Sequence, residues 1–159
     1  MIRVFRATPE DAASASQVLA ALYHREPAAE ERMGDILRDP GFVLFLAQTE
    51  DEYVAYLHAE LIDRLDGNTM LLVYDITVAP EHRRKGIATK LMEAALSLGR
   101  DTGAARCWLV TEPDNSPARG LYEKLNGDQW SAIGFGWTID RSKARFLAES
   151  LPGWRVFDD

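Results

Sequence analysis

The chain has 159 residues, of which 47% are hydrophobic and 27% charged, values typical of one globular domain with a real core. Its 18 basic and 25 acidic residues give a net charge of -7, which argues against nucleic acid and favours a cationic ligand, although acidity also serves solubility. Without an apolar run of membrane-spanning length or a signal-peptide segment, we expect a cytoplasmic protein with no membrane partner.

The first half of the chain predicts a strand, two helices and three strands. Alternating apolar and charged residues predict a short strand over 1–6. Thr8, Pro9 and the two acids after them predict a helix start, because each suits the first helical turn. The elements expected next are a helix over 30–38, an apolar strand over 42–48 buried on both faces, and strands over 53–62 and 70–78.

A helix is expected from about Lys85, with Gly99 and Gly103 ending it. Its inward face at helical spacing is Ile87, Leu91, Ala95 and Leu98.

The remaining pattern predicts a strand over 106–111 and then a helix with Ser116 as its cap. Asn126 and Gly127 are expected to end that helix. We expect β structure over 129–140 and a C-terminal extension over 141–159. No repeat or linker interrupts the chain, so one domain over 1–159 is expected.

A basic turn with one glycine, 83–86, separates the strand over 70–78 from the helix after it. The first turn of a helix has unpaired backbone N–H groups and lies at the positive end of the helix dipole. Gly86 has no Cβ, so a ligand can approach the backbone. The turn therefore favours a phosphate-bearing ligand, although basic surface turns also occur without one.

The segment Arg83 to Ala88 fits the Arg/Gln-x-x-Gly-x-Gly/Ala signature of the GCN5-related N-acetyltransferases (GNAT), and the element order over about 1–140 resembles theirs. The resemblance implies an α/β (α+β) GNAT fold. Its mixed, mostly antiparallel sheet would have about six or seven strands, about four flanking helices and two splayed central strands that form the acetyl-CoA cleft.

The same resemblance implies acetyl-CoA as co-substrate. The pantetheine arm would pair with Ile76 to Val78, and the pyrophosphate would meet the backbone after Arg83. A second motif, Asn115-x-x-Ala118 followed by Tyr122, would contact the arm and the sulfur. The cofactor residues so implied are Ile76, Thr77, Val78, Arg83, Arg84, Lys85, Gly86, Ile87, Ala88, Thr89, Asn115, Ala118 and Tyr122.

Tyr122 would act as a general acid, because a phenol can protonate a departing thiolate, although its place on an apolar helix face also fits simple packing. The amine must lose a proton, and Asp75 and Glu112 are the candidate bases, with Asp75, Glu112 and Asp114 as candidate substrate contacts. Asp75 could instead bond a neighbouring loop. His58 and His82 are alternatives, and His82 is expected to be a surface residue.

The run from Tyr74 to Thr89 is similar to the aminoglycoside 3-N-acetyltransferases of the gentamicin-resistance type. This resemblance implies antibiotic acetylation. Members of the family are often homodimers, and the aromatic residues Trp130, Phe135, Trp137 and Trp154 could form an interface or could pack against the protein's own sheet. The sequence departs from that family after Leu125. The alternative acceptors are another small amine, a polyamine or a protein amine.

Another class of function also fits the chain, which is a non-catalytic module that binds acyl-CoA. No residues have metal-ligand spacing, so no metal is expected. The single Cys107 cannot form an internal disulfide and, in an apolar strand, is expected to be a buried structural thiol.

Overall fold

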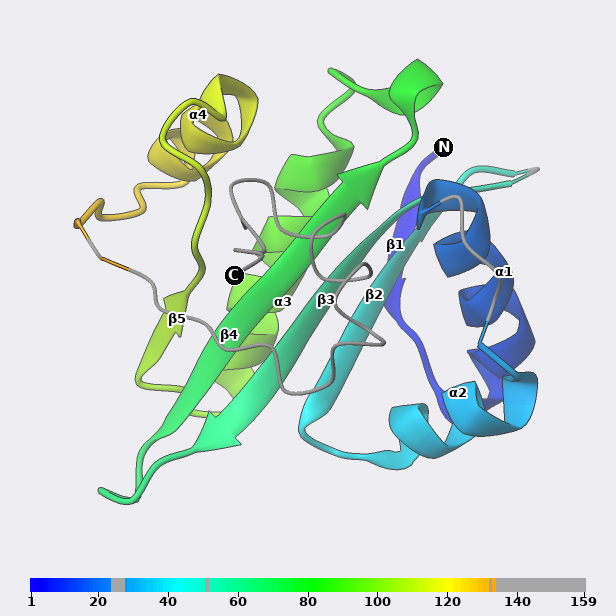
Figure 1. Ribbon diagram of the computed structural model, residues 1–159, viewed down its shortest axis with the longest axis horizontal. Coiled ribbons are helices and arrows are strands. Elements are labelled where there is room, and N and C mark those ends of the chain that lie inside the picture. The colour runs from blue at the N-terminus through cyan, green and yellow to red at the C-terminus, as the bar shows by residue number, and fades with distance from the viewer. Residues whose placement is uncertain (24–27, 51, 132, 134–159) are drawn as a thin grey trace, which may run out of the picture. The chain divides into compact units, whose positions relative to one another are not determined.

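The computed structural model describes residues 1–23, 28–50, 52–131 and 133 (Figure 1). The chain forms two compact units, Met1–Val110 and Thr111–Asp159, which are described separately below. Most of the β structure expected over 129–140 lies outside the described residues, as do the extension over 141–159 and most of the aromatic stretch expected at a dimer interface. The single domain and the homodimer stay predictions.

The first unit is built on a five-stranded sheet with the strands in sequence order. The first four strands pair antiparallel, and the fourth and fifth pair parallel. The predicted mixed, mostly antiparallel sheet is confirmed, with five strands among the described residues. The strands are β1 (Arg3–Arg6), β2 (Phe42–Gln48), β3 (Tyr53–Asp63), β4 (Thr69–Val78) and β5 (Arg106–Trp108).

The helices begin and end close to the predicted positions. The first helical turn is a short 3-10 segment in which the Asp11 carboxylate accepts a hydrogen bond from the Thr8 backbone N–H at 2.8 Å, as its acidic start predicts. The helical elements are η1 (Pro9–Asp11), α1 (Ala12–Tyr23), α2 (Glu30–Arg38), η2 (Pro80–His82), α3 (Ile87–Asp101) and, in the second unit, α4 (Ser116–Lys124).

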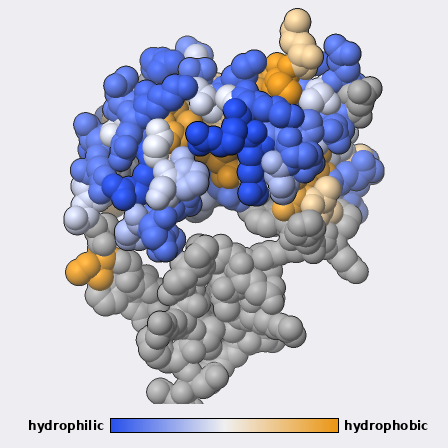
Figure 2. Space-filling view, turned by 90° about the horizontal axis from the view of Figure 1, so that it is seen from above, coloured by the Kyte–Doolittle hydropathy of each residue, from blue (hydrophilic) through white to orange (hydrophobic). Residues whose placement is uncertain are grey.

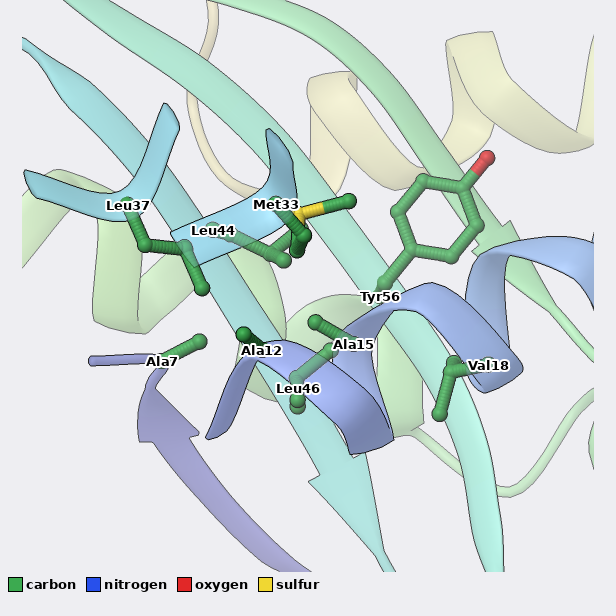
Figure 3. Close-up of a cluster of buried hydrophobic side chains, with 9 residues drawn as sticks. All are labelled: Ala7, Ala12, Ala15, Val18, Met33, Leu37, Leu44, Leu46 and Tyr56. Carbon is green, nitrogen blue, oxygen red and sulfur yellow. The ribbon is translucent and has the colours of Figure 1, made fainter. Parts of the chain in front are cut away.

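One face of the sheet packs against α1 and α2 through an apolar cluster (Figure 3). β2 contributes the alternate residues Leu44 and Leu46, because successive side chains of a strand point to opposite faces, and β3 contributes Tyr56. The cluster consists of Ala7, Ala12, Ala15, Val18, Met33, Leu37, Leu44, Leu46 and Tyr56. Both faces of β2 are buried, as its continuous apolar run predicts.

The opposite face packs against α3, which passes behind β3 and β4 in Figure 1. Gly99 does not end this helix, so that prediction is wrong. The helix continues to Asp101, and a Cβ placed on Gly99 would lie 3.5 Å from Leu71 Cδ2. That is an ordinary van der Waals distance, so Gly99 simply lies inside the helix where it packs on Leu71, and Gly103, at φ 71°, follows the helix end.

In the second unit, Asn115 caps α4 instead of the predicted Ser116. Its Oδ1 accepts a hydrogen bond from the Ala118 backbone N–H at 3.3 Å, whereas the Ser116 hydroxyl points back to the Asp114 carbonyl. An Asx side chain at this position satisfies one of the helix's unpaired donors. Asn126, at φ 59°, and Gly127 follow the helix, as predicted.

The face seen in Figure 2 is mainly hydrophilic over the described residues, with small, separate apolar patches. Of the helices in the described part of the chain, none is long and apolar enough to cross a membrane.

Replacing Leu91 by alanine should destabilise the first unit. The residue lies fully buried on the sheet-facing side of α3, and deletion of such a side chain costs about 2–5 kcal/mol of unfolding free energy. Leu65→Ala is the matched control, because Leu65 is fully exposed in the turn between β3 and β4. Urea unfolding of both variants checks the prediction, and equal losses would contradict it.

Candidate active site

A β-bulge in β4 determines which side chains reach the candidate site. Ala59 of β3 pairs with Val73, but the preceding residue, His58, pairs with Asp75. Tyr74 is therefore an extra residue, and Tyr74 and Asp75 together oppose His58. A bulge of this kind bends a strand and redirects its side chains. Here it places an aromatic residue and a carboxylate side by side.

The pairing between β4 and β5 is short. It covers only Met70–Leu72 on β4 and Arg106–Trp108 on β5. From Val73 to Val78, β4 pairs with β3 on one side and, among the described residues, has no strand partner on the other. The splayed central strands predicted by the resemblance are present. The backbone of Ile76 to Val78 can therefore pair with an extended ligand as a strand would.

Asp75 lies within a hydrogen-bonded network at this point of the sheet. The Tyr56 hydroxyl donates to Asp75 Oδ2 at 2.5 Å, and the Thr77 hydroxyl donates to the Tyr56 oxygen at 3.0 Å. Burial raises the pKa of the Asp75 carboxyl, and hydrogen bonds from the Ile76 backbone and the Thr77 side chain partly oppose this. A half-buried carboxylate of raised pKa is suited to accept a proton from an amine.

Tyr56 holds the network in place and was missed at the sequence level. Only 1% of its surface is exposed, and its ring packs in the cluster below α1 and α2. Figure 3 shows its hydroxyl pointing away from the other labelled side chains. Strand alternation puts Tyr56 and His58 on one face, but only the bulged register shows that Asp75 and Thr77 share that face.

The basic turn has the backbone geometry of an anion site. Gly86 is the N-cap of α3 in the left-handed conformation, at φ 78°, and Arg84 is also left-handed, at φ 62°. A Cβ on Gly86 would meet no atom within 4 Å, so the space above the turn is open. Ile87 is 2% exposed, so it can contact a ligand only through its backbone. The turn fits the phosphates of CoA.

Two contacts anchor the chain that leads into this turn. The Arg83 Nε donates to the Val78 carbonyl at 3.1 Å, so this side chain folds back onto β4. His82 Nε2 lies 2.9 Å from a Glu52 carboxylate oxygen, and the His82 side chain is only 15% exposed. His82 is thus half-buried and less exposed than expected, because it joins η2 to the turn before β3.

Lys85, Ala88 and Thr89 lie in the basic turn and the first turn of α3, and the predicted residues from Glu112 onward belong to the second unit. Glu112 and Asp114 are exposed, and Tyr122 is half-buried on α4. Asn115 and Ala118 form the helix cap. Their roles at the sulfur and at the acceptor stay predictions.

Cys107 is half-buried, and burial raises the pKa of its thiol, as expected for a structural cysteine. Within the described ranges, no group of three or more histidine, cysteine or acidic residues could hold a metal ion.

Comparison with known families identifies the class of protein. The acetyltransferase (GNAT) family matches residues 10–127, and the chain belongs to this family. It is therefore an N-acetyltransferase of a family that uses acetyl-CoA.

Particular relatives differ in their acceptors. The chain is 32% identical to an N-alpha-acetyltransferase of Saccharolobus solfataricus over 123 residues, which are 72% of this chain and 73% of the relative. An aminoglycoside acetyltransferase from an uncultured soil sample has the same fold, with a TM-score of 0.81 and 24% identity over 88% of this chain and 99% of that one. The aminoglycoside N-acetyltransferase AAC(6')-Iy, solved with CoA, has a TM-score of 0.73 and 16% identity over 88% and 96%.

Replacing Gly86 by alanine should weaken both folding and CoA binding. The left-handed backbone costs an L-residue about 1–2 kcal/mol, and any relaxation moves the N–H groups of the turn. Gly120→Ala is the matched control, because Gly120 lies inside α4 with open space around it, so alanine should stabilise by about 0.5–1 kcal/mol. Urea unfolding and CoA titration measure both effects. Unchanged CoA affinity in Gly86→Ala would contradict the role of the turn.

Proposed function

We propose that the chain transfers the acetyl group of acetyl-CoA to a primary amine of an aminoglycoside, with Asp75 as the base. The observation that carries this proposal is the Tyr56–Asp75–Thr77 network on the bulged part of β4. It holds a proton acceptor beside the strand edge to which the pantetheine arm would bind. A carboxylate used only for folding would not need to lie at that edge.

In the proposed reaction, Asp75 takes a proton from the ammonium group of the acceptor, directly or through water. The freed amine attacks the thioester carbonyl carbon, a C–N bond forms, the C–S bond breaks and the nitrogen releases its second proton to water. Tyr122 gives a proton to the departing CoA thiolate. The donor would be held by the backbone of Ile76 to Val78 and of the turn from Arg83 to Ala88, with Thr89, Asn115 and Ala118 as further contacts.

An aminoglycoside acceptor is supported by charge and by likeness. The net charge of -7 favours a polycation, and Glu112 and Asp114 are proposed as further carboxylates for its amines. The structural relatives above are named aminoglycoside acetyltransferases. The run from Tyr74 to Thr89 favours acetylation at the 3-amino group, whereas one of those relatives is a 6'-type enzyme by name. NMR of the product would identify the acetylated amine.

The second candidate acceptor is the amino group of a protein N-terminus. The relative from Saccharolobus solfataricus is named an N-alpha-acetyltransferase and covers most of this chain, which favours this alternative.

A thiol-release assay over a panel of amines decides between these acceptors. With acetyl-CoA as donor, we expect the highest kcat/KM for gentamicin, a lower value for spermidine and the lowest for an N-terminal peptide. Turnover of the peptide alone would favour the second candidate. Tight CoA binding without turnover of any amine would instead indicate a binding module.

The rate should fall at acidic pH with a midpoint above the ordinary pKa of aspartate. Asp75 works as a base only when ionised, and burial raises the pKa at which it ionises. The Asn substitution, Asp75→Asn, should lower kcat by about 100-fold or more and remove that midpoint. A pH profile of kcat/KM measures both.

The same pKa shift has a consequence for stability with a definite sign. Because the raised pKa favours the neutral form in the folded state, the contribution of Asp75 to stability is complete below the ordinary aspartate pKa. It is lost as the pH rises through the raised value. Asp75→Asn should remove this pH dependence of stability. In the pH profile of kcat/KM, an unchanged acid midpoint in that variant would argue against Asp75 as the base.

A further inference from the structure

We propose that Tyr74 and Glu60, supported by His58, form a cation subsite beside Asp75 that binds a second positive charge of the acceptor. This inference rests on the proposed function and adds to it the residues that select a diamine over a monoamine.

Three rings form a row across one face of the sheet, one from each of three neighbouring strands. The ring centroids of Phe42 and His58 lie 4.7 Å apart, and those of His58 and Tyr74 lie 5.0 Å apart with an interplanar angle of 18°. Tyr74 ends the row and is 53% exposed. One face of its ring is therefore fixed by His58, while much of the residue remains accessible to a ligand.

Glu60 places a negative charge next to this ring. The Tyr74 hydroxyl donates to Glu60 Oε2 at 3.4 Å, and His58 Nε2 lies 4.0 Å from Glu60 Oε1. In the described part of the chain, no lysine or arginine forms an ion pair with Glu60. Among the described residues, the basic group nearest to Glu60 is thus the imidazole of His58.

That imidazole does not compensate the charge. Burial lowers the pKa of His58, and the Glu60 carboxylate only partly opposes this, so the ring is neutral at physiological pH. Its Nε2 is buried and has no hydrogen-bond partner among the described residues. Burial and Glu60 raise the pKa of the Tyr74 phenol, which therefore stays neutral as well. Glu60 is left as an anion between two neutral rings.

An ammonium group matches this arrangement better than any neutral ligand. It can form a charge-assisted hydrogen bond with the carboxylate and lie against the exposed part of the tyrosine ring, where the aromatic quadrupole attracts cations. A guanidinium group would fit by the same chemistry.

The subsite lies directly beside the proposed base. Because of the bulge, Tyr74 and Asp75 are consecutive residues that both oppose His58. An acceptor with two amines can then present one amine at Asp75 while the other binds Glu60 and Tyr74. A monoamine gains only the first contact, so the arrangement should act mainly on acceptor affinity.

Putrescine and butylamine test the subsite, because they share a carbon skeleton and differ by one ammonium group. We expect the wild-type protein to bind putrescine about tenfold more tightly, in an NMR titration that follows the His58 ring protons. Glu60→Gln, which is isosteric, should reduce the preference to about onefold to threefold. Glu93→Gln on the exposed side of α3 is the matched control and should keep it.

Tyr74 variants separate the ring from its hydroxyl. Tyr74→Phe should retain most of the preference and Tyr74→Leu should lose it, because only the phenylalanine keeps an aromatic face. Circular dichroism confirms that each variant is folded. An equal preference for putrescine in the wild type and in Glu60→Gln would overturn the proposal.

Kinetics distinguish this inference from the proposed function. In gentamicin acetylation, Glu60→Gln should raise KM by about tenfold and change kcat by less than about twofold. If no amine is acetylated, the proposed function fails, and the NMR preference still decides the subsite. If gentamicin is acetylated with the same KM by the wild type and Glu60→Gln, the subsite is wrong and the proposed function stands.

Discussion

The extra residue in β4 is the constraint on which the rest of the candidate site depends. Before the bulge, Leu71 and Val73 point toward α3, and strict alternation would send Asp75 to that same apolar face. A carboxylate there would lie among buried side chains without polar partners, at a high cost in free energy. The single inserted residue reverses the alternation. Asp75 and Thr77 instead share a face with Tyr56 and His58.

The polar network and the apolar core stabilise each other at this face. The Tyr56 ring is almost completely buried, so its hydroxyl requires a hydrogen-bond partner, and Asp75 provides one. In return, the packed ring holds a donor in a fixed position beside the carboxylate. The packing of α1 and α2 against the sheet therefore also positions the hydroxyl group beside the proposed base.

The two ends of the proposed site have opposite chemical character. The turn before α3 offers backbone N–H groups and cations, and its shape depends on left-handed residues at Arg84 and Gly86. The bulged region offers carboxylates and an exposed aromatic ring. An anionic donor and a cationic acceptor can thus bind the first unit without competing for the same groups. This division fits a transferase that must bring two oppositely charged substrates together.

The sequence by itself determined most of the helices and strands and the basic turn, because these depend on residues near one another in the chain. The bounds of α2 follow from apolar residues at helical spacing and those of β2 from a continuous apolar run, and the role of Gly86 follows from its place between a strand and a helix. The tertiary structure decided the partners. Tyr56 meets Asp75 across 19 positions and His82 meets Glu52 across 30, and only strand register and the bulge bring such residues into contact. Gly99 likewise resembles a helix end locally but lies inside α3, where the helix packs on Leu71, since contacts distant in sequence override local propensity.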